Sequence, residues 1–302
     1  MSAAPQETDL LQEQLVGGSS FWSDAWKRLK KSRQAIVGGA ILIIVVVASL
    51  VGPFLTPYSQ EVQDLERQLE PPSWDHPFGT DLAGRDMLTR VLMGGRLSLA
   101  VGMVATLVSL LIGVTWGSVA GFKGGNVDNA MMRVVDMLYS LPFMFFVILL
   151  VAFLGRNLLL LFLALGAVQW LTMSRIVRGQ MIQLRAQEFV QAAVALGVSN
   201  RRIIFRHLIP NMLGPIIVYA TLTVPAVMLE EAFLSFLGLG VQPPNSSWGL
   251  LAADGAKTIT ALRTAWWLIL FPGLALGLTL FALNFLGDGL RDALDPKLKN
   301  QD

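Results

Sequence analysis

The sequence contains no cysteine, only two histidines, and few charged residues, which make up 15% of the chain. Without cysteine, neither a disulfide nor a thiolate metal site can form. The sequence also lacks the H-E-x-x-H, G-x-S-x-G and G-x-x-x-x-G-K-[ST] patterns of zinc peptidases, serine hydrolases and P-loop ATPases. We therefore expect no catalytic residue set, no metal and no cofactor, and a chain that is not itself an enzyme.

Hydrophobic residues dominate, at 54% of the chain with a mean hydropathy of +0.58. About 20 helical residues cross a bilayer core, and six apolar runs approach or exceed that length: 35–55, 98–121, 138–155, 157–174, 212–238 and 265–286. The first run lacks a small-residue cleavage site and is therefore predicted to be a retained anchor. The expected class is an all-α membrane protein with six transmembrane helices.

The distribution of lysine and arginine predicts the orientation of these helices. With the N-terminus inside, 16 of the 23 basic residues fall on the cytoplasmic side and 7 on the outer side, as the positive-inside rule requires. Both termini are then cytoplasmic, and His76 and His207 lie in different compartments. Because the basic residues follow topology, the pI near 9.0 does not indicate a nucleic-acid partner.

The N-terminal region is expected to begin with a flexible lead over 1–18, followed by an interfacial basic helix over 19–34. In that helix Trp22 and Trp26 share an apolar face, and lysines occupy the other face. This pattern predicts contact with membrane lipid on the inner leaflet, or simply a basic segment that sets topology.

The outer loop between the first two runs carries Asp86 and Arg90, which are expected to pair on a short helix ended by Gly94 and Gly95. A structural role is expected for this loop, and contact with an external binding protein is the alternative.

Two runs carry glycines spaced four residues apart, a pattern that predicts close helix packing. A ligand contact through exposed backbone is the alternative. These glycines are Gly113, Gly117 and Gly121 in the second run and Gly273 and Gly277 in the sixth.

Only two acidic residues, Glu230 and Glu231, lie inside an apolar run. Charged groups at membrane depth usually face a water-filled path or a partner, so these residues and the nearby Ser235 are candidates for a translocation path. A structural role near the membrane surface is the alternative. The other runs offer almost no ionisable residues, which argues against an ion-driven transporter.

The most informative stretch is the polar loop Gln191–Asn211. Gly197 is placed to close a short helix as its C′ residue, Ser199 or Asn200 to cap a second helix ending near His207, and Pro210 to begin the next segment. The small residues Ala192 and Ala193 suit close approach to a partner surface.

This loop, Gln191-Ala192-Ala193-x₃-Gly197-x₉-His207-Leu208-Ile209-Pro210-Asn211, resembles the EAA loop of binding-protein-dependent ABC importer permeases. Further segments resemble the peptide branch of that family, and most of all the C subunit of oligopeptide importers. They are Phe78–Asp86, Arg96–Leu99, Phe143–Leu150, Ser174–Gly179, Leu234–Gly240, Ser247–Gly249 and Gly287–Pro296.

The resemblance implies a type I ABC importer fold in the bacterial inner membrane. The implied partners are a second permease subunit, two ATP-binding subunits and an extracytoplasmic peptide-binding protein. It also implies coupling to the ATP-binding subunits through Glu188, Gln191, Ala192, Ala193, Gly197, Arg201, Arg206, His207 and Pro210. The family's usual glutamate is replaced by Gln191, and Glu188 lies on roughly the same helical face and could supply the charge.

The expected division is a first transmembrane helix and outer loop over 35–96, a permease domain over 97–287 with its coupling loop at 186–211, and a cytoplasmic tail over 288–302. Dipeptide, glutathione and nickel uptake stay open as alternative cargoes. A stand-alone secondary transporter is the alternative from another class.

Overall fold

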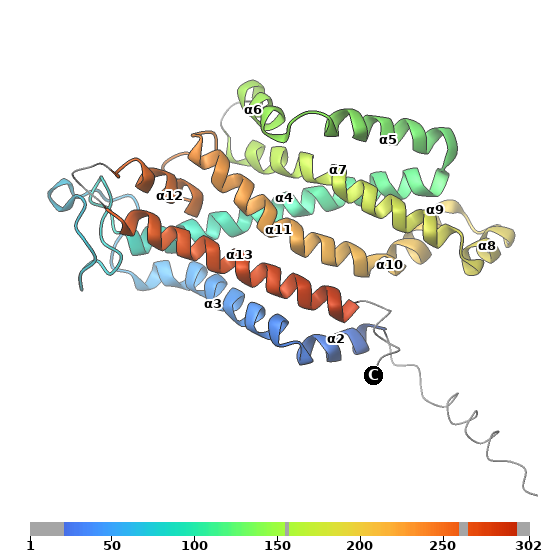
Figure 1. The fold of residues 1–302 in the computed structure, drawn as a ribbon, viewed down its shortest axis with the longest axis horizontal. Helices are drawn as coiled ribbons and strands as arrows, with labels where there is room; N and C mark the ends of the chain where they lie inside the picture. Colours follow the sequence, from blue (N-terminus) through green and yellow to red (C-terminus); the bar gives the residue numbers. More distant parts are fainter. Residues whose placement is uncertain (1–20, 155–156, 260–264, 295–302) are drawn as a thin grey trace, which may run out of the picture.

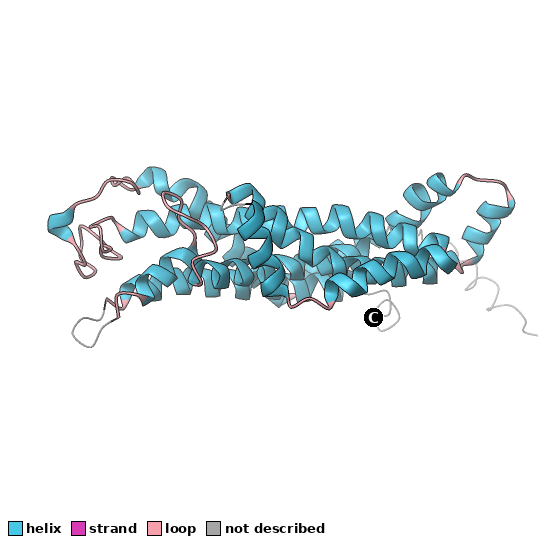
Figure 2. Ribbon diagram, turned by 90° about the horizontal axis from the view of Figure 1, so that it is seen from above, coloured by secondary structure: helices cyan, strands magenta, loops and turns pink. Residues whose placement is uncertain are grey.

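The computed structural model describes residues 21–154, 157–259 and 265–294, and its long helices run side by side in an elongated bundle (Figures 1 and 2). Five described helices are long and apolar enough to cross a membrane: α3 (Arg33–Leu55), α4 (Met87–Lys123), α7 (Leu158–Arg185), α11 (Leu213–Phe236) and α13 (Trp267–Leu294). The shorter helices are α2 (Phe21–Lys31), η1 (Leu65–Arg67), α5 (Gly125–Tyr139), α6 (Phe143–Leu154), α8 (Glu188–Ala195), α9 (Asn200–Arg202), η2 (Ile203–Leu208), α10 (Ile209–Asn211) and α12 (Trp248–Ala256). The all-α class is confirmed.

The third expected span, at 138–155, is wrong as a single helix. α5 ends at Tyr139, and α6 begins only at Phe143 and has 12 residues, too few for a bilayer core about 30 Å thick. Pro142 accounts for the break, because it has no N–H and disfavours the helical conformation at the residue before it. α5 and α6 instead follow one another along α7 (Figure 1).

α7 is longer than expected and contains Arg175 and Arg178, which come after the end of the expected span at residue 174. Both side chains pair with carboxylates of α5. Arg178 binds Asp128 through two bonds of 2.5 and 2.6 Å, and Arg175 donates to Asp136 at 2.8 Å. These ion pairs hold the polar helix α5 against α7.

The glycine pattern of the second run packs α4 against α7, as expected. A Cβ built on Gly113 would lie 2.6 Å from the Cβ of Met173, and one on Gly121 would lie 2.8 Å from the carbonyl oxygen of Arg178. Only glycine permits this approach. The same expectation is not met at Gly273 and Gly277 on α13, where the described chain places no atom within 4 Å of a built Cβ.

The second span begins at Met87 rather than near residue 98, and it runs straight through Gly94 and Gly95. The expected helix end at these glycines is therefore wrong. Instead they let α12 approach α4, since a Cβ on Gly95 would lie 2.8 Å from the indole of Trp248.

Asp86 caps the start of α4, where its carboxylate accepts the Thr89 N–H at 2.8 Å. The expected Asp86–Arg90 pair does not form. Asp86 lies 2.9 Å from Nδ1 of His76, and Arg90 pairs with Asp81.

The outer loop is folded onto the bundle, which supports its expected structural role. The Trp267 indole donates to the Thr80 carbonyl at 3.1 Å, and the rings of Phe78 and Phe271 stack at 3.9 Å between centroids. On the exposed side of the loop, Glu70 and then Asp75 raise the pKa of Arg67.

α2 is helical, as expected for the segment 19–34. Trp22 and Trp26 are exposed, and α2 packs against α3 and α13. The Lys30 ammonium lies 5.1 Å from the Trp26 ring centroid, so this lysine leans over the aromatic face instead of pointing away from it. The expected lead over 1–18 and the end of the 288–302 tail lie outside the described residues.

Candidate functional site

The predicted coupling loop forms a short helix, α8, which projects beyond the ends of the long helices (Figure 1). Gly197 has φ of +73°. Its N–H donates to Val194 at 3.0 Å, and the next N–H, that of Val198, donates to Ala193 at 3.1 Å. This pair of bonds is a Schellman motif, which confirms Gly197 as the residue that closes the first helix.

The second helix of the loop also forms, with an unexpected geometry. Ser199 is its N-cap, and α9 is followed directly by the π-helical segment η2 and then by α10, which contains Pro210. Proline clashes with the carbonyl four residues earlier in a regular α-helix, and a wider π turn relieves that clash.

Buried apolar side chains anchor the loop to the bundle. Val190, Ile203 and Leu208 pack into one cluster with Met181 of α7 and Phe122 of α4. The position of α8 is therefore set by the ends of α4 and α7.

The predicted coupling residues are mostly at the surface of this loop. Ala193 and His207 are half-buried, and Ala193 touches the anchoring cluster. The exposed ones are Glu188, Gln191, Ala192, Gly197, Arg201, Arg206 and Pro210.

Sequence reasoning missed the apolar part of the same surface. Four large hydrophobic side chains are exposed there: Phe189, Val194, Leu196 (83% exposed) and Phe205. We call these four residues, together with Ala192, the docking surface. Phe189, Ala192 and Leu196 are spaced three and four residues apart, which places them on one face of α8. Exposed apolar surface of this kind marks protein interaction sites. The presence of these apolar residues in a short polar loop is the sequence signal that could have identified the surface.

Gln191 has a contact that a glutamate could not make. Its Nε2 donates to the carbonyl oxygen of Ala186 at 3.2 Å, which joins α8 to the C-cap of α7. Glu188 occupies the first turn of α8, where the helix dipole favours a negative side chain. A groove of about 650 Å³ lies beside Gln191, with Lys123 and Arg185 on its wall.

The two acidic residues of α11 occupy separate environments. Glu231 is 1% exposed, and its Oε1 accepts the hydroxyls of Ser235 at 2.6 Å and Ser247 at 2.8 Å. Since Ser247 also caps α12, this cluster fastens α12 to α11. The structure places Glu231 and Ser235 inside the chain rather than on the cavity described next.

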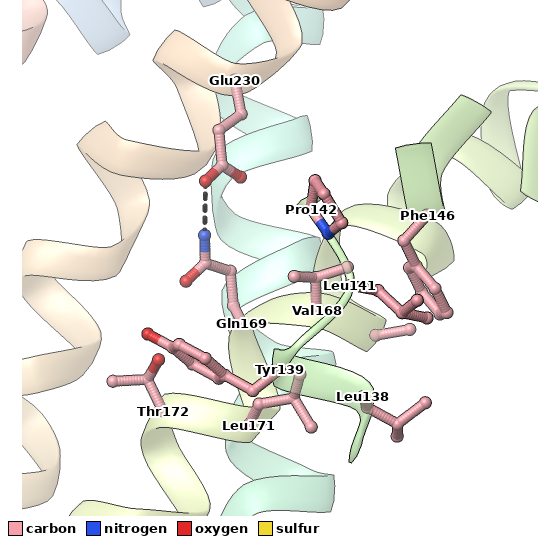
Figure 3. Close-up of a pocket in the computed structure, with 11 residues that line it drawn as sticks. Leu138, Tyr139, Leu141, Pro142, Phe146, Val168, Gln169, Leu171, Thr172 and Glu230 are labelled. Carbon is pink, nitrogen blue, oxygen red and sulfur yellow. Dashed lines mark hydrogen bonds between the residues drawn. The ribbon is translucent and has the colours of Figure 1, made fainter. Parts of the chain in front are cut away.

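Glu230 lines a cavity of about 410 Å³ at the break between α5 and α6 (Figure 3). Its Oε1 accepts a bond of 2.7 Å from Nε2 of Gln169 on α7, and its Oε2 is buried without a hydrogen-bond partner in the described part of the chain. Tyr139 and Thr172 supply hydroxyls to the wall, and the rest of the lining is apolar. Gln169 and Tyr139 were not singled out from the sequence.

The fold is a helical bundle with five membrane-length helices in the described chain and a short helix, α8, that projects from one end (Figure 1). A chain of the MetNI methionine ABC transporter, in an inward-facing conformation, matches it with a TM-score of 0.57, covering 69% of this chain and 98% of that one. The two sequences are 16% identical, so this likeness concerns the fold alone.

The family follows from the sequence comparison. The profile of the binding-protein-dependent transport system inner membrane component matches residues 113–300. The profile of the N-terminal transmembrane domain of oligopeptide transport permease C matches residues 20–72. The chain belongs to the binding-protein-dependent transport system inner membrane components, and it is a transport subunit rather than an enzyme.

Close relatives are permeases of peptide transport systems. The dipeptide transport system permease protein DppC of Bacillus subtilis is 50% identical over 93% of this chain and 87% of its own length. The oligopeptide transport system permease protein OppC is 47% identical in Haemophilus influenzae, over 97% of this chain and 94% of the relative. OppC of Escherichia coli K12 is 49% identical over 93% of both chains.

Proposed function

We propose that the chain is a permease subunit of an ATP-driven peptide importer and forms half of the translocation path. The observation that carries this proposal is near-50% identity to peptide permeases along almost the whole length of both chains. The missing phosphate-binding pattern fits a subunit that takes its energy from separate ATP-binding partners.

The cargo is a peptide, and both dipeptides and short oligopeptides fit the relatives. The dipeptide permease and the oligopeptide permeases are similar to this chain to nearly the same degree. Uptake of radiolabelled dipeptide, tripeptide and pentapeptide by cells with and without the gene tests the proposal. Loss of peptide uptake on deletion supports it, and unchanged uptake of all three contradicts it.

The ATP-binding subunits dock on α8 and the segment after it. Support comes from the docking surface, whose apolar side chains are exposed in the described chain. It also comes from the anchoring of α8 on α4 and α7, which links a movement of α8 to the long helices. Purification of the chain with its operon neighbours tests this: the proposal requires two ATP-binding subunits and a second permease in the complex, while saturable ATP hydrolysis by the isolated chain contradicts it.

The proposed setting is the bacterial inner membrane, with both termini and the docking surface in the cytoplasm and the loop between α3 and α4 outside. The basic-residue count supports this orientation. An extracytoplasmic binding protein would then deliver peptide to the end of the bundle opposite α8.

A further inference from the structure

We infer that the cavity around Glu230 binds a primary ammonium group of the peptide in transit, with Glu230 as its anionic partner. This inference rests on the proposed peptide cargo. It assigns a ligand chemistry to one cavity of this chain.

The first support is the incomplete hydrogen bonding of Glu230. One carboxylate oxygen accepts from Gln169, and the other is buried with no partner among the described residues. A buried carboxylate oxygen without a donor has lost its hydration and gained nothing in exchange, which destabilises it, and an ammonium group has three donors to offer. The two groups are complementary.

The second support is the absence of a competing cation. Among the residues that the structure describes, the lining of the cavity contains no lysine, arginine or histidine. The neighbouring Arg175 is engaged elsewhere: it pairs with Asp136 at 2.8 Å and lies over the Tyr139 ring at 4.3 Å. Among the described lining residues, Glu230 is therefore the only one with a carboxylate or a basic side chain.

The third support is the break between α5 and α6. The last residues of α5, Leu138 and Tyr139, line the cavity, so the carbonyl end of a 15-residue helix lies at its wall. The C-terminal end of a helix carries partial negative charge and favours cations. Broken helices at membrane depth are tolerated where they line a cavity.

The rest of the cavity suits an amino-terminal residue. Leu141, Phe146 and Leu171 contribute apolar wall, and the hydroxyls of Tyr139 and Thr172 lie together on the side away from Leu141 and Phe146 (Figure 3). The volume of about 410 Å³ lies in the range of small-molecule sites, roughly 300–1,000 Å³.

α5 also offers a polar approach to the cavity. Asn129, Arg133, Asp136 and Ser140 are exposed and spaced four, three and four residues apart, which places them on one face of the helix. Polar side chains on a helix packed beside a membrane span face water or a partner subunit. This face leads along α5 to the break where Glu230 lies.

The test uses the complete transporter in nanodiscs without its binding protein, so that only the membrane path can bind peptide. Saturation-transfer NMR titrations compare Ala-Phe with N-acetyl-Ala-Phe, which lacks the ammonium. We expect wild type to favour the free peptide by about 10-fold or more. The isosteric variant Glu230→Gln should lose most of this preference, and Glu230→Asp should keep part of it.

A third ligand, N-acetyl-Ala-Lys amide, separates the two sources of the ammonium. Binding at the level of Ala-Phe supports a site for any primary ammonium, and weak binding supports a site for the peptide amino terminus. An undiminished preference for the free peptide in Glu230→Gln overturns the inference, as does equal binding of Ala-Phe and N-acetyl-Ala-Phe in wild type.

ATP-driven uptake of Ala-Phe by the complete wild-type system, with binding protein, distinguishes failure of the ammonium site from failure of the proposed peptide-importer function. If wild type imports peptide but Glu230→Gln leaves the NMR preference intact, the ammonium site is wrong and the peptide importer stands. If wild type imports none of the tested peptides, the proposed function itself fails.

Discussion

Glu230 and Glu231 are consecutive residues of α11, yet their carboxylates lie in different surroundings. Glu230 faces the cavity beside Gln169 of α7, and Glu231 is enclosed by two serine hydroxyls that link α11 to α12. Adjacent positions on a helix point about 100° apart, so one residue can face a path while its neighbour faces the chain's own interior. The sequence alone could not say which residue does which.

The first prediction concerns Glu231. Glu231→Ala removes the acceptor shared by Ser235 and Ser247 and should destabilise the folded permease by about 2 kcal/mol or more. Thermal unfolding of the purified complex, followed by size-exclusion chromatography, measures the loss. Glu231→Gln keeps one acceptor oxygen and should lose less. Glu230→Ala is the matched control, with near-wild-type assembly and reduced peptide uptake; equal stability of wild type and Glu231→Ala would contradict the assignment.

Much of the fold follows from local patterns in the sequence. Five of the six long apolar runs correspond to the five membrane-length helices of the described chain. The spacing of Gly113, Gly117 and Gly121 predicted a close helix contact, which α4 makes with α7. Gly197 was predictable as a helix end because a left-handed residue after a short helix is most often glycine.

Other features depend on residues far away in the sequence. The apolar run 138–155 continues across Pro142, so its hydropathy gave no sign of the break between α5 and α6. The polar helix α5 was not among the expected spans. The arginines that pair with its Asp128 and Asp136 come 50 and 39 residues later. In the same way, the partner of Glu230 on α7 lies 61 residues away.

The second prediction concerns the backbone at Gly197. Its φ is +73°, and a Cβ built there meets no atom within 4 Å, so a substitution is penalised by conformation and not by crowding. Gly197→Val should destabilise the end of α8 by about 1–2 kcal/mol, and Gly197→Asn by less, since asparagine tolerates this conformation.

Hydrogen–deuterium exchange of peptides covering 186–199 measures the effect, and faster exchange is expected in Gly197→Val. Gly179 on α7 is the control, because it is exposed, has open space around a built Cβ and has no positive φ. If Gly179→Val loosened the loop as much as Gly197→Val, conformational strain at Gly197 would not be the cause.

The third prediction concerns topology, and the lack of cysteine makes it simple to test. Trp74 in the outer loop and Leu196 after α8 are both highly exposed. In spheroplasts that lack the ATP-binding subunits, which would cover Leu196, a membrane-impermeant maleimide should label Trp74→Cys in intact spheroplasts and Leu196→Cys only after permeabilisation. The cysteine-free parent gives the background, and the reverse pattern would invert the proposed orientation.

The fourth prediction concerns docking of the ATP-binding subunits. Ala192 is exposed on α8, next to Phe189 and Leu196, whereas Ala193 is half-buried against the anchoring cluster. An arginine at 192 leaves the chain's own packing intact. It places a long charged side chain in the proposed apolar interface, and burying that charge weakens docking by a few kcal/mol. Ala192→Arg should therefore insert normally, pair with the second permease, and lose at least about 10-fold in bound ATP-binding subunit.

Comparison with Ala193→Arg separates docking from internal packing, because an arginine at 193 disturbs both, whereas one at 192 disturbs only docking. Ala193→Arg should lower both the amount of folded permease and the amount of bound ATP-binding subunit, whereas Ala192→Arg should lower only the bound ATP-binding subunit. Co-purification stoichiometry, normalised to inserted permease, measures the two effects independently. A normal amount of bound ATP-binding subunit in Ala192→Arg would show that these subunits do not dock on the exposed face of α8.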